Sequence, residues 1–218
     1  MKGQAVSPYR LRRMEFEDIG QVELIEREAF PTLWPPTSYR KELKNNLANY
    51  LVCVHTGEFV EERNGVASRD GIISRALSFL GIIKSKQDVV TSRELIVGFI
   101  GMWCMADEGH IVSIAVKENY RRKGLGELLL LGSLELAIDT GLYDVTLEAR
   151  VTNYGAHALY EKYGFRHVGV RKGYYSDNRE DAAIMTTDPI LSVQYKGMLE
   201  ERRSKFEKRY DDSERLSY

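Results

Sequence analysis

Short apolar runs and helix-like amphipathic stretches alternate along the chain, most clearly in its second half. A short apolar run between polar or turn residues is typical of a buried strand, whereas apolar residues three and four positions apart predict a helix. The strands predicted in this way are residues 49–57, 94–105, 109–116, 143–151, 166–175 and 182–188. Residues 9–30 are expected to form a short strand and then a helix, and further helices are predicted at residues 38–47, 126–141 and 153–164. Strands that alternate with helices indicate an α/β fold with a mixed sheet.

Two segments interrupt or extend this pattern. Residues 57–94 separate two strands that otherwise look like neighbours, and within them the apolar positions of residues 71–83 fit one face of a helix. This helix is too short to cross a membrane, so we expect it to pack on its own domain or on a second copy of the chain, with a membrane surface as the alternative. Residues 190–218 carry dense mixed charge around an apolar stripe and predict a charged helical tail. Residues 1–189 are expected to form one domain, with residues 57–94 as an insertion.

Charge and composition exclude some classes of partner. The chain has 218 residues, with 31 Lys and Arg against 32 Asp and Glu, so no overall electrostatic attraction to nucleic acid or to anionic membranes is expected. Its first residues lack the apolar core of a signal peptide, and no apolar run is long enough to span a bilayer. Cys53 and Cys104 show no metal-ligand spacing, so no metal site is predicted. We expect a cytoplasmic protein with reduced cysteines.

A basic, glycine-containing loop comes between the strand at residues 109–116 and the helix that follows. Its sequence from Arg121 to Gly126 is RRKGLG. A helix N-terminus offers free amides and the positive end of the helix dipole, and glycines let the backbone approach a bulky anion. The loop lacks the spacing of a Walker motif, and Leu129 stands where a dinucleotide-binding fingerprint needs glycine. The residues alone predict a pyrophosphate-binding turn, with a plain helix start as the alternative.

Two stretches of sequence resemble the GNAT acetyltransferase superfamily. IVSIAVKENYRRKGLGELLL is similar to its acyl-coenzyme A motif, and LEARVTNYGAHALYEKYGFRHVGVRKGYY is similar to its later motif. The nearest resemblance is to the RimI-type enzymes, which acetylate an N-terminal alanine of a ribosomal protein. The resemblance implies an α/β (α+β) fold with a mixed, mostly antiparallel central sheet flanked by helices. It also implies acetyl-CoA as co-substrate, with its pyrophosphate on the loop amides and its pantetheine arm on the preceding strand. The residues assigned to coenzyme binding are Ile114, Ala115, Val116, Arg121, Arg122, Lys123, Gly124, Leu125, Gly126, Glu127 and Asn153.

The same resemblance assigns two catalytic residues. Glu148, in LEARVTN, corresponds to the general base that deprotonates the acceptor amine, and Tyr160 corresponds to the acid that protonates the leaving thiolate. An α-amine has a pKa of about 7.7 to 8.0, so a modest base is sufficient. A phenol with a pKa of about 10 stays protonated at neutral pH. Without the resemblance, Glu148 would be read as an exposed strand residue and Tyr160 as a packed helix residue.

Aromatic residues are expected to form the acceptor site. REAFPTLWPP resembles the family's Phe-Pro loop, which places Phe30, Pro31 and Trp34 on one wall. GYYSDNREDAAIM resembles the segment that places Tyr174 and Tyr175 on the opposite wall. The resulting hypothesis is direct acetyl transfer to a protein N-terminus, for example that of a ribosomal protein, without contact with nucleic acid. The alternatives are a small-molecule or polyamine acetyltransferase on the same fold, and a non-catalytic acyl-CoA sensor.

Overall fold

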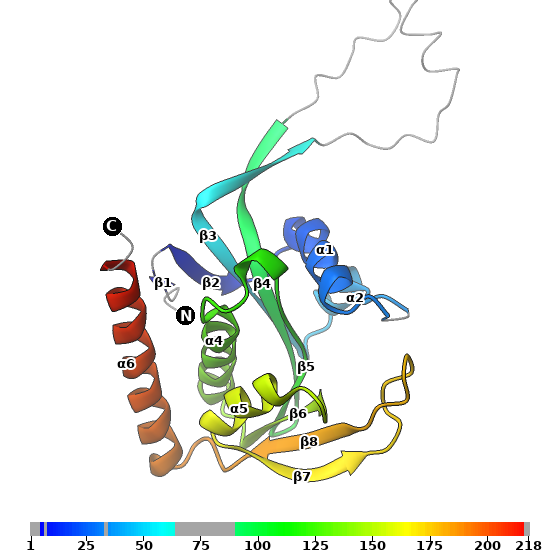
Figure 1. Ribbon diagram of the computed structural model, residues 1–218, viewed down its shortest axis with the longest axis vertical. Helices are drawn as coiled ribbons and strands as arrows, with labels where there is room; N and C mark the ends of the chain where they lie inside the picture. The colour runs from blue at the N-terminus through cyan, green and yellow to red at the C-terminus, as the bar shows by residue number, and fades with distance from the viewer. Residues whose placement is uncertain (1–4, 7, 33–34, 64–89, 216–218) are drawn as a thin grey trace, which may run out of the picture.

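Eight strands form one twisted sheet in the order β1-β2-β3-β4-β5-β6-β8-β7 (Figure 1). The structure is a computed structural model, which describes residues 5–6, 8–32, 35–63 and 90–215. Strands β5 and β6 are parallel, and every other neighbouring pair is antiparallel. This arrangement confirms the mixed, mostly antiparallel sheet expected from the sequence. The strands are β1 (Ala5–Val6), β2 (Tyr9–Arg13), β3 (Ala48–Arg63), β4 (Val90–Met105), β5 (Glu108–Val116), β6 (Asp144–Arg150), β7 (Phe165–Arg171) and β8 (Ala182–Thr187).

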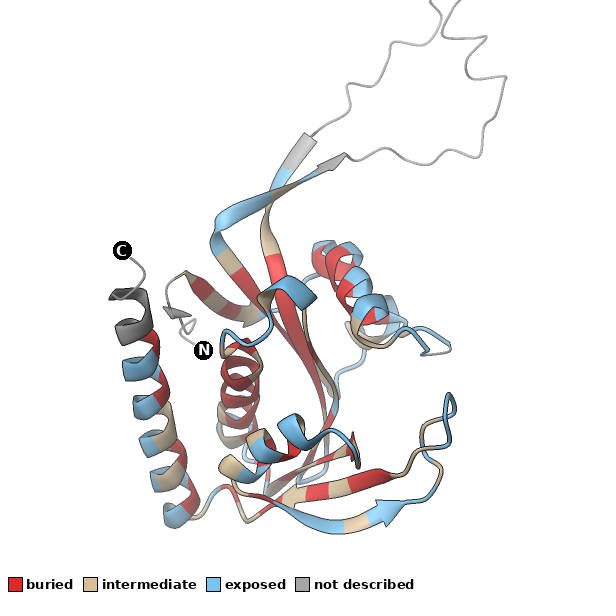
Figure 2. Ribbon diagram, viewed as in Figure 1, coloured by how far each residue is buried: buried red, intermediate tan, exposed pale blue. Residues whose placement is uncertain are grey.

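Helices cover both faces of the sheet (Figure 1). Helices α1 (Ile19–Ala29) and α2 (Tyr39–Glu42) lie on one face. Helix α4 (Leu125–Asp139) lies on the other face, with α6 (Val193–Arg215) alongside it, and α5 (Tyr154–Lys162) packs beside β7. Figure 2 shows α4 buried on nearly all sides, because it is enclosed between the sheet and α6. Its almost continuous apolar sequence is typical of such a helix.

The sheet separates two hydrophobic cores. The larger core packs α4, α5 and α6 against one face of the sheet. The smaller core packs α1 and α2 against the other face, around Val22, Tyr39 and Phe99. The strands that carry the candidate site therefore have a fixed apolar layer on each side.

The segment expected to be an insertion begins as an extension of the sheet. Strands β3 and β4 pair as their sequences suggested, and the pairing continues to Arg63 opposite Val90. The apolar stretch at residues 71–83 lies outside the described residues. The helix predicted at residues 38–47 is shorter than expected, because the Asn45 side chain accepts a hydrogen bond from the Leu47 amide at 3.1 Å and turns the chain. None of the described helices is long and apolar enough to cross a bilayer.

Candidate active site

The parallel strands β5 and β6 separate partway along their length. They pair only as far as Ile111 and Leu147. Beyond this point β5 continues beside β4, and β6 continues beside β8. A one-residue bulge at Val112 comes where the strands part. Within the described part of the chain, β5 therefore has no strand neighbour on its β6 side beyond Ile111, and Glu148 is the first β6 residue past the paired region.

The basic loop joins β5 to α4 in a conformation suited to an anion. Arg122 and Gly124 both have left-handed backbone angles, with φ of 65° and 78°. This conformation costs a non-glycine residue about 1–2 kcal/mol, and strain of this kind is typical of functional sites. The first helical hydrogen bond of α4 runs from the Leu128 amide to the Gly124 carbonyl. The amides before it have no partner along the helix and, with the helix dipole, favour a negative charge at this end.

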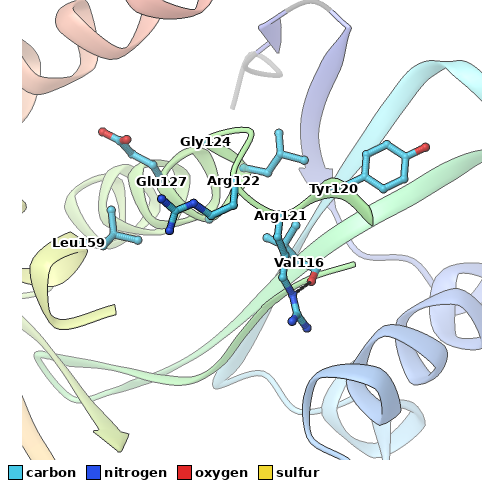
Figure 3. A pocket seen from close by; sticks show the side chains of 9 residues that line it. Val116, Tyr120, Arg121, Arg122, Gly124, Glu127 and Leu159 are labelled. Atoms are coloured by element: carbon cyan, nitrogen blue, oxygen red, sulfur yellow. Dashed lines mark hydrogen bonds between the residues drawn. The ribbon is translucent and has the colours of Figure 1, made fainter. Parts of the chain in front are cut away.

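A cavity of about 290 Å³ lies at this helix N-terminus (Figure 3). Arg121 lies along its wall and donates a hydrogen bond from Nε to the Val116 carbonyl, 3.1 Å away. A Cβ atom at Gly126 would meet nothing within 4 Å, whereas one at Gly124 would lie 3.2 Å from the ring of Phe206. The loop therefore has an open side at Gly126 and a packed side at Gly124. The residues that line the cavity are Val116, Tyr120, Arg121, Arg122, Gly124, Leu125, Gly126, Glu127 and Leu159.

Four residues expected to bind coenzyme lie outside this cavity lining. Ile114 and Ala115 lie on β5, in the part that has separated from β6. Lys123 places its ammonium group 4.7 Å from the centre of the Tyr120 ring. Asn153 is the N-cap of α5, and its side-chain oxygen accepts a hydrogen bond at 3.2 Å from a first-turn amide.

Glu127 lines the cavity, but its carboxylate is bound from the side of α5 and α6. Tyr163 donates a hydrogen bond to it from its hydroxyl at 2.6 Å, and Arg209 donates from Nη2 at 2.6 Å. Lys162 forms an ion pair with the same carboxylate. Burial disfavours the charged form, but these three donors prevail and hold the pKa of Glu127 below its ordinary value. The carboxylate thus ties three helices together at the edge of the cavity.

Glu148 is positioned by two basic side chains. Nε2 of His110 lies 2.7 Å from its Oε2, and Nε of Arg171 lies 2.8 Å from its Oε1. Its side chain is only 8% exposed, so Glu148 is not an exposed strand residue. Leu147 and Ala149 belong to the larger core, so the alternation of β6 turns Glu148 to the opposite face of the sheet. The carboxylate therefore sits, with both oxygens engaged, where β5 and β6 part.

Tyr160, on α5, packs in the larger core, on the face of the sheet that carries Leu147 and Ala149. Its side chain is 6% exposed and its ring centre lies 5.6 Å from that of Phe165. Burial raises the pKa of Tyr160 well above its ordinary value, with a further contribution from Tyr175. Glu148 in turn contributes to the raised pKa of Tyr175, which burial dominates. Tyr175 thus lies within electrostatic range of both residues, and the Tyr160 phenol is protonated at neutral pH.

The aromatic residues expected on the two acceptor walls lie in two separate loops. Phe30 ends α1 and packs, partly buried, against the smaller core, and Pro31 next to it is exposed. Trp34 lies outside the described residues. Tyr174 and Tyr175 lie between β7 and β8, with their ring centres 5.2 Å apart and their planes nearly perpendicular.

A polar bridge joins these two loops. The Thr32 hydroxyl donates to Oδ2 of Asp177 at 3.0 Å, although 145 positions separate the two residues. The same oxygen accepts a hydrogen bond from Arg150 at 2.7 Å. The Arg150 guanidinium also binds Glu180 at 3.0 Å and lies 3.9 Å from the centre of the Tyr175 ring. Arg150 follows Glu148 by two positions on β6, so one strand positions both the carboxylate and the tyrosine loop.

Sequence reasoning missed the partners of the predicted residues. His110 and Arg171 bind Glu148, and Thr32, Asp177 and Arg150 join the two loops. A sequence signal was available for His110 alone: it lies in the strand before the basic loop, and side chains near the end of the paired part of β5 can reach β6. The other contacts depend on loop geometry that local patterns do not specify.

Comparisons with known proteins agree with this geometry. A family model described as the acetyltransferase (GNAT) family matches residues 19–165. An N-alpha-acetyltransferase of Sulfolobus acidocaldarius is 36% identical over 178 residues, which are 81% of this chain and 90% of that protein. A Bacillus subtilis protein whose name refers to a ribosomal-protein bS18 alanine acceptor is 33% identical over 176 residues, which are 80% of this chain and 92% of that protein. The crystal structure of the ribosomal-protein-S18-alanine N-acetyltransferase from Escherichia coli superposes with a TM-score of 0.58 at 25% identity, over 85% of this chain and 96% of that chain.

Proposed function

Because this chain belongs to the acetyltransferase (GNAT) family and is an acetyltransferase, we propose that it transfers the acetyl group of acetyl-CoA to the α-amine of a protein N-terminus. The observation that carries the proposal is the separation of β5 from β6. The basic loop lies at the far end of β5, and Glu148 lies where β6 leaves it. A donor bound along β5 would thus have its pyrophosphate on the loop and its reactive end near Glu148.

The cavity supports acetyl-CoA as the acetyl donor. Gly126 leaves open space for a bulky anion, and Arg121 and Arg122 add positive charge beside the α4 amides. The β5 backbone at Ile114, beyond the pairing of β5 with β6, is suited to hydrogen bonding an extended pantetheine arm, whereas Ala115 next to it pairs with Phe99 of β4. Acetyl-CoA supplies the thioester carbonyl that the acceptor amine attacks.

Glu148 and Tyr160 are suited to the two proton transfers. In this mechanism the Glu148 carboxylate accepts a proton from the acceptor ammonium, directly or through a water molecule, and His110 and Arg171 hold the carboxylate in position. The amine nitrogen forms a bond to the acetyl carbon, the carbon–sulfur bond breaks, and the nitrogen loses its second proton to water. The Tyr160 phenol, kept protonated by burial, gives its proton to the departing sulfur. No covalent acetyl-enzyme is required.

The charges around the acceptor site favour a single amine over a polyamine. A polyamine would seek several free carboxylates, but Glu148 already has Arg171 beside it. Asp177 and Glu180, at the rim, are engaged by Arg150. Aromatic walls at Phe30 and Tyr174 suit a peptide backbone with a small first side chain. The relatives named for N-terminal and ribosomal-protein alanine acetylation support the same acceptor class.

Thiol release from acetyl-CoA, measured with short peptides that differ only in their first residue, tests this function. We expect turnover on peptides that begin with Ala or Ser, and a loss of about 10²-fold or more in kcat for Glu148→Gln and Tyr160→Phe. Glu161→Gln, on an exposed position of α5, is the matched control and should keep wild-type kcat. Turnover on spermidine, with none on any peptide, would contradict the proposal.

A further inference from the structure

Helix α6 packs against the basic loop although it lies outside the residues matched by the family model. That match ends at residue 165, whereas α6 begins at Val193. Its apolar stripe is buried in the larger core, and the helix runs alongside α4 towards the cavity end of that helix (Figures 1 and 2). The residues of this stripe are Tyr195, Leu199, Phe206 and Tyr210.

Two rings of α6 press against the backbone of the loop. A Cβ atom at Gly124 would lie 3.2 Å from Phe206 and 3.7 Å from Tyr210. Gly124 also has a left-handed φ of 78°, which glycine adopts without strain. Helix α6 therefore packs against the loop at Gly124, whereas the space at Gly126 stays open.

Arg209 of α6 also changes the charge at the cavity. Glu127 lies in the first turn of α4, where the helix dipole stabilises its carboxylate but the same charge would repel a phosphate bound at that end. Arg209 binds its Oε2 at 2.6 Å, while Lys162 and Tyr163 bind Oε1. Together with Lys162, the guanidinium outweighs the charge of Glu127, which is the only carboxylate among the described residues that line this cavity.

We propose that α6 sets the affinity of this chain for acyl-coenzyme A, with Arg209, beside Lys162, offsetting the charge of Glu127 and Phe206 fixing the loop backbone. Both are positioning residues, which act through Glu127 and Gly124. The inference rests on the proposed function only in taking this cavity as the coenzyme site. It assigns a role to the charged tail beyond that of a solvated helix.

Calorimetric titration of the full-length protein with acetyl-CoA tests the role of Arg209. We expect Arg209→Ala to raise the Kd for acetyl-CoA about fivefold, the size expected for one screened charge near an anion. The same substitution in a Glu127→Gln background should change Kd by less than about twofold, because the charge to be cancelled is gone. A merely structural role predicts an equal loss in both backgrounds and would overturn the inference.

Two further variants separate charge from helix docking. Arg203 binds Glu135 at 3.0 Å on the same pair of helices but away from the loop, so Arg203→Ala should leave Kd within about twofold of wild type. Arg209→Lys keeps the charge and should restore most of the affinity. An equal rise in Kd for Arg203→Ala and Arg209→Ala would refute a specific role of Arg209.

The outcome is separable from that of the proposed function. If the wild-type protein fails to bind acetyl-CoA, both proposals fail. If it binds acetyl-CoA but acetylates no peptide, only the acceptor assignment fails. The Kd values of Arg209→Ala in the wild-type and Glu127→Gln backgrounds then still test the role of α6. Circular dichroism melting of each variant confirms that Kd is measured on folded protein.

Discussion

The cavity proposed to bind coenzyme and the two loops proposed to bind the acceptor are stabilised by different kinds of contact. The loop at the cavity is fixed by buried rings of α6 and by backbone geometry at Arg122 and Gly124. The two acceptor loops are instead joined by hydrogen bonds between exposed polar side chains, of which Thr32 to Asp177 is the clearest. Close packing resists small displacements, whereas an exposed hydrogen bond contributes only about 0.5–1.5 kcal/mol. On the proposed function, the cavity would thus be preorganised for one constant ligand, and the two loops would be able to adjust to different acceptors.

Tyr160→Phe should slow acetyl transfer while leaving the cavity and the two acceptor loops unchanged. The substitution removes one hydroxyl from a buried ring, so we expect kcat to fall about 10²-fold with little change in the Kd for acetyl-CoA. Tyr163→Phe is the matched control on the same helix: its hydroxyl binds Glu127, so its loss should weaken coenzyme binding more than turnover at saturation. Single-turnover thiol release and calorimetry measure the two quantities. The reverse pattern would show that the roles of the two tyrosines are exchanged.

Gly124→Ala and Gly126→Ala should separate packing from ligand space in the loop. At Gly124 the new methyl group meets Phe206 and takes a left-handed φ, so we expect a loss of about 2 kcal/mol or more in the free energy of unfolding. For a chain of this size that lowers Tm by about 4 to 8 °C. At Gly126 the methyl group enters open space, so Tm should change little while the Kd for acetyl-CoA rises. Equal changes in Tm would contradict the packed role of Gly124.

Thr32→Val should weaken the contact between the two proposed acceptor loops without affecting the cavity. The substitution keeps the shape of the side chain but removes its hydrogen bond to Asp177, so we expect the peptide KM to rise about three- to fivefold. The Kd for acetyl-CoA and kcat should stay within about twofold of wild type. Asp181→Asn is the control, because the Asp181 carboxylate binds Lys172 and the Gly173 amide, both within its own hairpin. A peptide KM unchanged by Thr32→Val would show that the bridge does not position the acceptor.

The same contrast explains how far the site could be predicted from sequence. Arg121, Gly124 and Gly126 could be recognised because the loop, the strand before it and the helix after it are contiguous, and the periodicity of each element is local. Glu148 and Tyr160 could be assigned by resemblance for the same reason. The hydrogen bond from Thr32 to Asp177 could not be predicted, because it depends on how two distant loops approach each other. The tail was recognised as a charged helix, yet nothing in its own sequence tells which of its arginines meets Glu127.

Lowering the pH should reveal a smaller difference between the cavity and the proposed acceptor loops, in the pH at which their carboxylate contacts are lost. The donors around Glu127 lower its folded pKa below the unfolded value of about 4.3. A carboxylate with a lowered pKa stabilises the fold above the unfolded pKa, and this contribution is lost as the pH falls through the folded pKa. The Tm difference between wild type and Glu127→Gln should therefore be a few degrees at pH 7 and should shrink as the pH falls below about 4.3.

Glu180 provides the comparison at the acceptor end. Hydrogen bonds from Thr152, and then from Arg150, lower its pKa to about 2. The sign is the same as for Glu127, but the contacts of Glu180 should persist until the pH approaches about 2. A pH series of melting curves for Glu127→Gln and Glu180→Gln measures both. If the Tm difference for Glu127→Gln stayed constant from pH 7 to pH 3, the charge of Glu127 would not be what holds α6 against the loop, and the contact would depend on Phe206 and Tyr210 alone.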